Sequence, residues 1–103
     1  MADAPSGGID LQFEWDDDNA ASNLEKPGVS FEEAGTVFRA PFALIFDDEA
    51  HSIEEQREII IGHSTRNRLL LVCFTERGDK LRIFSARLAT RKERQDYERH
   101  TNL

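Results

Sequence analysis

Cysteines and long apolar stretches are scarce in this sequence, and their scarcity excludes several classes of protein. The 103 residues include one cysteine, Cys73, which excludes an internal disulfide and fits a reducing compartment. No apolar run approaches the roughly 18–20 residues of a membrane span, and the first ten residues lack the basic and apolar regions of a secretory signal. Zinc-type Cys–His spacing and a Gly-rich phosphate loop are absent too. We therefore expect a cytoplasmic protein without a metal or other cofactor and without a membrane partner.

The chain has the length of a single domain, because domains most often contain about 100–150 residues. Charged residues make up 32% of it, more than the usual ~25%, which predicts a wide solvated surface. Residues 1–12 include Pro5, Gly7 and Gly8 and show no periodicity, which predicts a flexible tail. Residues 13–103 are expected to form the domain.

The two halves of the chain carry opposite charge. Residues 1–56 hold 14 acidic and 2 basic side chains, whereas residues 57–103 hold 6 acidic and 11 basic ones, and the net charge is −7. This asymmetry is typical of a protein with a polyanionic or strongly charged partner. A surface on which the two halves form salt bridges explains it equally well. The negative total argues against broad, non-specific binding of nucleic acid.

Apolar periodicity and capping signals predict the element order β-α-α-β-β-β-β-α. Asp16 can cap the first helix, which Pro27-Gly28 ends, while Ser30 with Glu33 forms a capping box for the second. The predicted strands are 13–15, 42–46, 57–63, 69–77 and 80–87. A last polar helix covers about 91–100, and Thr90 with Glu93 forms its capping box. Since short connections join the last four strands, the fold class is α+β. We expect a compact antiparallel sheet of about four or five strands, two N-terminal helices on one face, and a C-terminal helix.

A predicted hairpin gathers cations at one end of the sheet. Gly78-Asp79 suits a two-residue type II′ turn, which would pair Arg77 with Lys80, Thr75 with Arg82, and Cys73 with Phe84. By strand alternation, one face would then carry Thr75, Arg77, Lys80 and Arg82. Ser85 and Arg87 would point to the other face. Like charges facing each other cost stability, so the cluster is a candidate for binding an anion such as phosphate. The alternative is that an exposed hairpin tip simply tolerates charge.

Among the three histidines, His51 is the candidate for proton transfer. It follows Asp47 and Asp48 and could act as a general acid or base, although an ordinary surface histidine fits the pattern too. No histidine pair has the spacing of metal ligands. Cys73 lies among apolar residues, which is typical of a small buried side chain rather than a nucleophile. RNA cleavage fits these groups, because the 2′-OH of RNA attacks its own phosphate and the protein supplies position, charge and proton transfer.

An ordered series of motifs makes the chain resemble the BrnT family of bacterial toxins. The series is Phe13-Glu14-Trp15-Asp16, Asn23, Lys26 to Ala34, Val37-Phe38, Asp48, His51, Arg57, Ile61 to Ser64, Thr75 to Asp79, Arg82 to Arg87, Glu93-Arg94 and Tyr97. It covers about residues 13–99. The resemblance implies a RelE-like ribonuclease toxin of a type II toxin–antitoxin system, neutralised by BrnA, a ribbon-helix-helix antitoxin. Contact with DNA would be indirect, through that antitoxin.

The leading hypothesis is a metal-independent endoribonuclease toxin that cleaves RNA and inhibits translation. The candidate catalytic residues are Thr75, Arg77, Arg82, His51 and Ser85, and the candidate RNA phosphate ligands are Arg57, Lys80 and Arg87. The alternative is a non-catalytic binding module that acts as antitoxin partner and co-repressor. Two departures from the family pattern motivate it, because Pro27 stands where relatives usually have histidine and Phe74 where they often have histidine or another polar residue.

Overall fold

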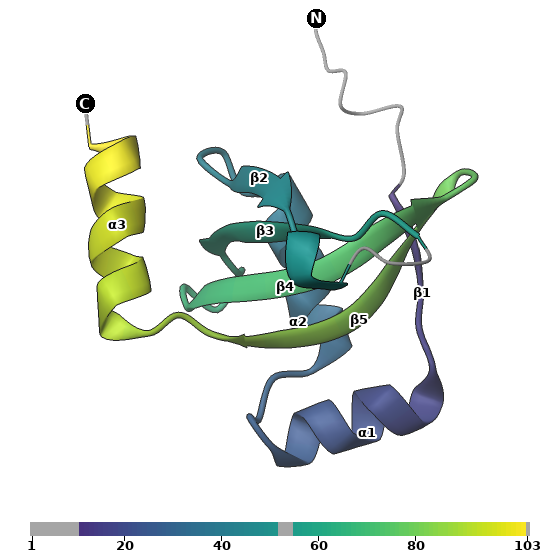
Figure 1. The fold of residues 1–103 in the computed structure, drawn as a ribbon. Coiled ribbons are helices and arrows are strands. Elements are labelled where there is room, and N and C mark those ends of the chain that lie inside the picture. The colour runs from purple at the N-terminus through teal and green to yellow at the C-terminus, as the bar shows by residue number, and fades with distance from the viewer. Residues whose placement is uncertain (1–10, 52–54, 103) are drawn as a thin grey trace, which may run out of the picture.

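The computed structural model describes residues 11–51 and 55–102 and has the predicted α+β fold (Figure 1). The strands are β1 (Gln12–Glu14), β2 (Leu44–Asp47), β3 (Glu58–His63), β4 (Leu69–Arg77) and β5 (Lys80–Leu88). The helices are α1 (Asp17–Glu25), α2 (Phe31–Thr36) and α3 (Arg91–Thr101), with short 3-10 turns η2 (Val37–Arg39) and η3 (Glu49–His51). The predicted tail falls mostly outside the described residues, although Gln12 is already the first residue of β1. No helix in the described ranges has the length and apolar character to cross a membrane.

The five strands form one mixed sheet in the order β1-β5-β4-β3-β2. Strands β2 to β5 pair antiparallel, as their short connections predict. Strand β1 pairs parallel with the start of β5, where Phe13 lies opposite Leu81. No tight turn joins β1 to β5, so no hairpin fixes their relative direction. The confirmed α+β class therefore includes one parallel pair at the edge.

The β4–β5 hairpin confirms the predicted turn and corrects the predicted register beyond it. Gly78 has φ +61°, a conformation that favours glycine, and Arg77 lies opposite Lys80. The predicted pairing of Cys73 with Phe84 is wrong, because a bulge intervenes and Cys73 lies opposite Ser85. An extra residue in one strand reverses the alternation of the faces.

The bulge also overturns the predicted placement of two site residues. Phe74 pairs with Ile83 before the bulge, and Cys73 with Ser85 after it, so Phe84 is the extra residue of β5. Ser85 and Arg87 therefore share the sheet face of Thr75 and Arg82, rather than the opposite face that strict alternation predicts.

Helix α2 covers one sheet face and closes the main core. Its apolar stripe packs on the sheet as predicted, and the buried members of this core are Val29, Phe31, Ala34, Val37, Ile60, Leu70, Val72, Phe74, Ile83 and Ala86. Helix α1 lies beside β5 and adds Ala20 to the same core. Asn23 of α1 bonds both polar groups of the Ala86 backbone at 3.2 and 2.8 Å. Its amide thus occupies the edge of β5 that β1 leaves uncovered.

The opposite face is only partly covered. Tyr97 of α3 packs there against Ile61, Leu69 and Leu71, and its hydroxyl donates to the Phe42 carbonyl at 3.0 Å. Helix α3 otherwise stands at the side of the sheet (Figure 1). The part of this face over β4 and β5 is therefore open.

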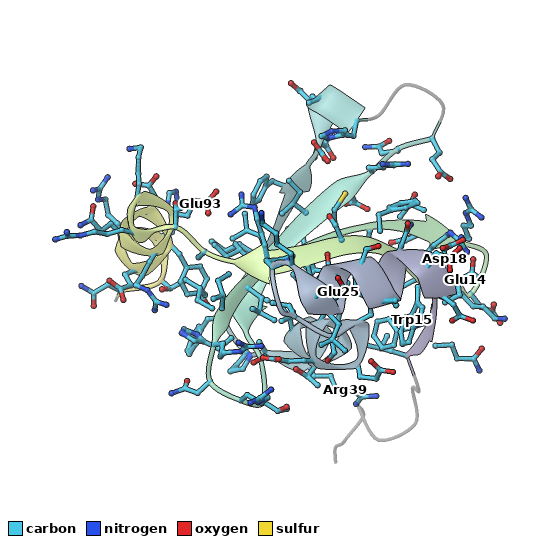
Figure 2. The ribbon with its side chains drawn as sticks, turned by 90° about the horizontal axis from the view of Figure 1, so that it is seen from below. Glu14, Trp15, Asp18, Glu25, Arg39 and Glu93 are labelled. Atoms are coloured by element: carbon cyan, nitrogen blue, oxygen red, sulfur yellow. The ribbon has the colours of Figure 1, made fainter. Side chains whose placement is uncertain are left out.

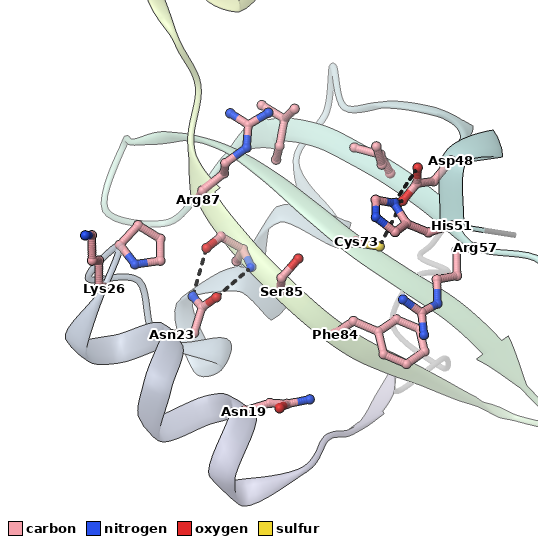
Figure 3. A pocket seen from close by; sticks show the side chains of 14 residues that line it. Asn19, Asn23, Lys26, Asp48, His51, Arg57, Cys73, Phe84, Ser85 and Arg87 are labelled. Carbon is pink, nitrogen blue, oxygen red and sulfur yellow. Dashed lines mark hydrogen bonds and ion pairs between the residues drawn. The ribbon is translucent and has the colours of Figure 1, made fainter.

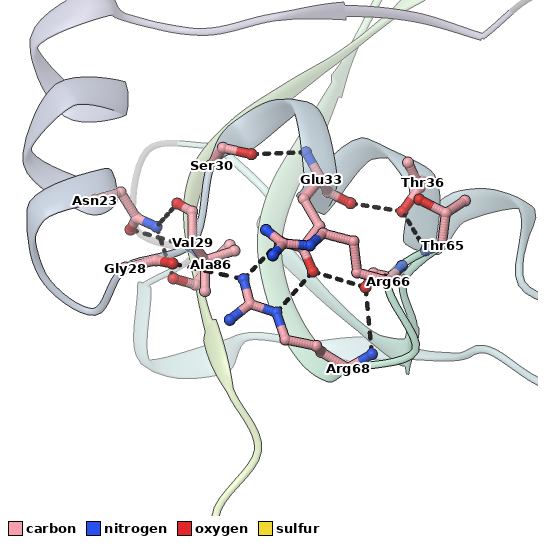
Figure 4. A network of polar contacts seen from close by, with 11 residues as sticks. Asn23, Gly28, Val29, Ser30, Glu33, Thr36, Thr65, Arg66, Arg68 and Ala86 are labelled. Carbon is pink, nitrogen blue, oxygen red and sulfur yellow. Dashed lines mark hydrogen bonds and ion pairs between the residues drawn. The ribbon is translucent and has the colours of Figure 1, made fainter.

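A buried ionic network joins α2 to the β3–β4 turn (Figure 4). Ser30 accepts from the Glu33 amide at 3.0 Å, which confirms half of the predicted capping box. The Glu33 carboxylate does not return to the cap; it accepts from Arg68 Nε at 2.9 Å and from Ser64 at 2.7 Å. The Arg68 hydrogen bond lowers the pKa of Glu33 against the opposing effect of burial. The second predicted box, Thr90 with Glu93, is complete.

Candidate functional site

An open pocket of about 670 Å³ lies on the sheet face opposite α2. Helix α1 forms one side, β5 and β4 form the floor, and η3 with the start of β3 forms the other side (Figure 3). Its lining residues are Asn19, Asn23, Lys26, Pro27, Asp48, His51, Arg57, Ile59, Leu71, Cys73, Phe84, Ser85, Ala86 and Arg87. Three segments far apart in the sequence thus meet around one cavity.

His51 and Asp48 form a hydrogen-bonded pair at the η3 side of the pocket. His51 Nδ1 lies 3.1 and 3.0 Å from the two Asp48 carboxylate oxygens. The imidazole side chain is 65% exposed, whereas the Asp48 side chain is 11% exposed. A carboxylate on Nδ1 orients the ring and leaves Nε2 available to exchange a proton. The pair has the arrangement of a general base with its orienting partner.

Cys73 lies beneath this pair on the pocket floor. Its thiol donates to Asp48 Oδ2 at 3.4 Å. Burial, followed by the Asp48 carboxylate, raises the pKa of the thiol to about 11. A protonated thiol is a poor nucleophile, so the geometry agrees with the predicted packing role of Cys73.

Arg57 and Phe84 form a stacked pair in the pocket wall. The guanidinium carbon of Arg57 lies 3.8 Å from the centre of the Phe84 ring, within the range of a cation–π interaction. The backbone carbonyl of Arg57 accepts from the Asp48 amide at 2.9 Å. The stack and the His51–Asp48 pair are therefore fixed to each other through the main chain (Figure 3).

Arg87 brings a second arginine to the pocket. Both of its terminal nitrogens bond the Glu93 carboxylate at 2.8 Å, and this interaction lowers the pKa of Glu93 to about 2. The Arg87 side chain is still 48% exposed. It thus retains surface that an anion can approach, next to exposed Ser85.

The predicted cationic cluster at the hairpin end lies outside the pocket lining and is neutralised within the chain. Arg82 bonds Glu14 at 3.1 Å, and Arg77 bonds Glu55 at 3.2 Å. Thr75 is buried and donates to the Gln56 carbonyl. Figure 2 shows Glu14 near this end of the molecule and Glu93 on α3. Arg82 and Arg87 thus have separate carboxylate partners.

The structure therefore divides the predicted site residues into two groups. His51, Arg57, Ser85 and Arg87 line the pocket, whereas Thr75, Arg77, Lys80 and Arg82 lie toward the hairpin turn. Sequence reasoning missed Asn19, Asn23, Lys26 and Phe84 as pocket residues. The spacing of Asp48 and His51 is the one local signal that indicated a pair. The predicted pairing of Cys73 with Phe84 already placed Phe84 on this face, but no signal in the sequence marked its ring as part of a site.

The two departures from the family pattern occupy different places. Pro27 lines the pocket beside Lys26, so a histidine at this position would lie at the pocket rim. Phe74 is buried in the α2-facing core, where its ring meets that of Phe38 at 4.8 Å. The Phe74 departure therefore leaves the pocket unchanged.

Comparisons with known proteins identify a family and a fold. A sequence profile described as "Ribonuclease toxin, BrnT, of type II toxin-antitoxin system" matches residues 15–93. The crystal structure of the Brucella abortus ribonuclease toxin BrnT is similar, with a TM-score of 0.62 and 22% sequence identity. That match covers 80% of this chain and 100% of the Brucella chain. A search of curated protein sequences found no significant match.

Proposed function

The chain belongs to the BrnT family of ribonuclease toxins of type II toxin–antitoxin systems, and from this premise we propose that it cleaves RNA in the α1–β5 pocket and thereby inhibits translation. The observation that carries the proposal is the His51–Asp48 pair facing the same cavity as Arg57 and Arg87. RNA is cleaved when its 2′-oxygen attacks the adjacent phosphate. This reaction requires a base and cations around one cavity.

The proposed reaction needs only groups of the chain and the RNA itself. His51 Nε2 takes the proton of the 2′-OH, and the 2′-oxygen forms a bond to the adjacent phosphorus. The bond from phosphorus to the 5′-oxygen breaks, and that oxygen takes a proton from a water molecule. The hydroxide so formed takes the proton that His51 gained, which regenerates the base and the water. The products are a 2′,3′-cyclic phosphate and a 5′-hydroxyl. Asp48 holds the imidazole by Nδ1 and stabilises its positive charge after proton transfer.

Arg57 and Arg87 are proposed to bind the phosphate as its charge grows. Arginine offers a planar set of donors that suits phosphate oxygens. The Arg57 guanidinium stacks on the Phe84 ring, and Arg87 forms an ion pair with Glu93. Both cations are therefore positioned before RNA binds. Ser85 lies between them on β5 and can donate a hydrogen bond to a phosphate oxygen.

The hairpin group is proposed to extend the RNA path. Thr75 and Arg82 share the sheet face of the pocket, and Arg77 and Lys80 follow toward the turn. Their pairing with Glu14 and Glu55 means that RNA phosphate has to compete with carboxylates there. We therefore assign the cations of this group, Arg77, Lys80 and Arg82, to strand binding, and Thr75, which is buried, only supports them. Arg77→Ala should accordingly raise KM more than it lowers kcat.

Cleavage by the purified protein tests the proposal. His51→Ala should lower kcat on a short RNA by about 10²-fold or more, the usual range for loss of a general base. His100→Ala is the matched control, because this exposed histidine lies on α3 outside the pocket. Activity should persist in EDTA and yield the cyclic phosphate. Intact RNA after incubation with folded wild-type protein would contradict the proposal.

A BrnA-like ribbon-helix-helix antitoxin is the proposed partner, and any contact with DNA would pass through it. Co-expression with the protein encoded beside the toxin should restore growth. Stable binding of that protein without growth arrest by the toxin alone would instead support a co-repressing module. The co-repressing function is the second candidate because Pro27, which has no titratable group, lies at the pocket rim.

A further inference from the structure

We propose that the Arg57–Phe84 stack is a nucleobase-binding wall, which places one base of the RNA beside the His51–Asp48 pair. The inference rests on the proposed function, since it assigns a substrate subsite within the same pocket. It concerns how the RNA is held, and it assigns a role to Phe84, which the cleavage chemistry leaves unused.

Phe84 faces the pocket from within the bulge of β5. With regular alternation it would pair across the ladder with Cys73, but Ser85 takes that place. Phe84 is the extra residue, and its ring lines the cavity without a cross-strand partner. The bulge also puts Ser85 and Arg87 on the face that Phe84 shares, and bulges of this kind are common next to active sites. A half-buried aromatic ring in a polar, cation-lined cavity is typical of a stacking surface.

Arg57 makes the wall suited to a base rather than to an apolar ligand. Its guanidinium lies 3.8 Å from the Phe84 ring centre, so the pair presents flat, partly cationic surface. Bases stack on aromatic rings and on arginine planes alike. Stacking would also leave the positive charge of Arg57 close to the phosphate that follows the base.

The position of the wall relative to the catalytic pair supports the assignment. The Asp48 amide bonds the Arg57 carbonyl at 2.9 Å, and the same Asp48 holds His51. A nucleotide whose base rests on the wall therefore has its ribose near His51. On the other side of the pocket, Asn19 of α1 offers an amide that can donate to or accept from a base edge (Figure 3).

Binding of an oligonucleotide that cannot be cleaved tests the wall independently of catalysis. The probes are a 2′-O-methyl tetra-adenylate and a 2′-O-methyl ribose-phosphate tetramer of the same length without bases, both titrated by calorimetry. Phe84→Leu removes the flat ring but keeps apolar volume. Phe84→Trp keeps a flat ring, and Phe42→Leu is a matched control at an exposed phenylalanine outside the pocket.

We expect Phe84→Leu to weaken binding of the tetra-adenylate by about 5- to 150-fold, which corresponds to ~1–3 kcal/mol for one stacked base. Binding of the base-free tetramer should not change, and Phe84→Trp and Phe42→Leu should bind both probes as wild type does.

Equal losses on both probes would overturn the wall while leaving RNA cleavage as proposed. If folded wild-type protein binds neither probe, the wall is wrong. Loss of RNA cleavage with base-dependent binding retained would overturn only the proposed function.

Discussion

Single polar side chains fix segments that lie far apart in this chain. Glu33 of α2 bonds Arg68 and Ser64 across more than 30 positions, and its side chain is 5% exposed. A buried carboxylate is stable only when its oxygens are paired. The network therefore determines how α2 sits on the turn between β3 and β4.

Replacing Glu33 by glutamine should lower the free energy of unfolding by about 1–3 kcal/mol near neutral pH, because hydrogen bonds to a charged group are lost. The lowered pKa of Glu33 stabilises the fold above its ordinary value of 4.5, and this contribution disappears as pH falls below it. The difference between Glu33→Gln and wild type should therefore shrink in acid. Urea unfolding near neutral pH and near pH 3 measures both effects. Glu32→Gln, at an exposed neighbour, should differ little from wild type at either pH.

Local sequence predicted the Ser30 cap but not the fate of Glu33. The capping-box pattern describes residues three positions apart, whereas the partners of the Glu33 carboxylate come from a turn formed much later in the chain. The same limit applied to Arg77 and Arg82. Their proximity was predicted correctly, but their neutralisation by Glu14 depends on β1 pairing beside β5.

The edge of β5 is completed by a helix rather than by a full strand. Strand β1 covers β5 only from Lys80 to Arg82. Beyond that, Asn23 of α1 bonds the Ala86 amide and carbonyl and also the Val29 carbonyl at 2.8 Å. Since Ala86 lies between Ser85 and Arg87, this contact holds both pocket residues in register.

Asn23→Asp tests this contact. Aspartate has the size of asparagine but no amide donors, so its carboxylate would face the Val29 and Ala86 carbonyls. We expect a loss of at least ~1–3 kcal/mol in the free energy of unfolding, since a buried charge is left unpaired. Asn19→Asp is the control on the exposed side of the same helix. Equal unfolding midpoints in urea for both variants would show that Asn23 does not hold α1 on β5.

Element order and the hairpin turn were predictable because their signals are local. Ser30, Thr90 and Asp16 cap helices as predicted, and Gly78 opens the turn. The bulge at Phe84, opposite Cys73 and Phe74, has no such signal. It places Ala86 rather than Ser85 in the core beneath α2, and it places Ser85 and Arg87 on the pocket face. The candidate site was predicted in part for this reason, since His51 and Arg57 precede the bulge in the chain, whereas the face of Ser85 and Arg87 depends on it.

The charge asymmetry of the whole chain is largely resolved inside the molecule. Acidic side chains of the first half pair with basic side chains of the second half, as Glu14 does with Arg82, Glu33 with Arg68, and Glu55 with Arg77. The salt-bridged surface that the sequence left open thus explains much of the asymmetry. The cations that line the pocket, Lys26, Arg57 and Arg87, form a local group on a chain of net charge −7.

Because few cations line the pocket, we predict a weak salt dependence for RNA binding. Single-stranded nucleic acid gives a slope of about −0.7 per neutralised phosphate in a plot of log K against log salt concentration. If Lys26, Arg57 and Arg87 are the cations that meet phosphate, the slope should be about −2. Calorimetric titration of a longer 2′-O-methyl oligoadenylate, of about ten nucleotides, at several salt concentrations measures it, because a tetramer has too few phosphates to give a steeper slope.

Arg57→Ala should reduce that slope by about 0.7, because one phosphate contact is lost. Arg99→Ala, on the outer side of α3 and outside the α1–β5 pocket, should leave it unchanged. A wild-type slope of about −4 or steeper would contradict a local site. It would mean that RNA displaces carboxylates such as Glu14 and Glu55 from their arginines and follows the sheet face to the hairpin, because only then would enough cations be free to meet phosphate.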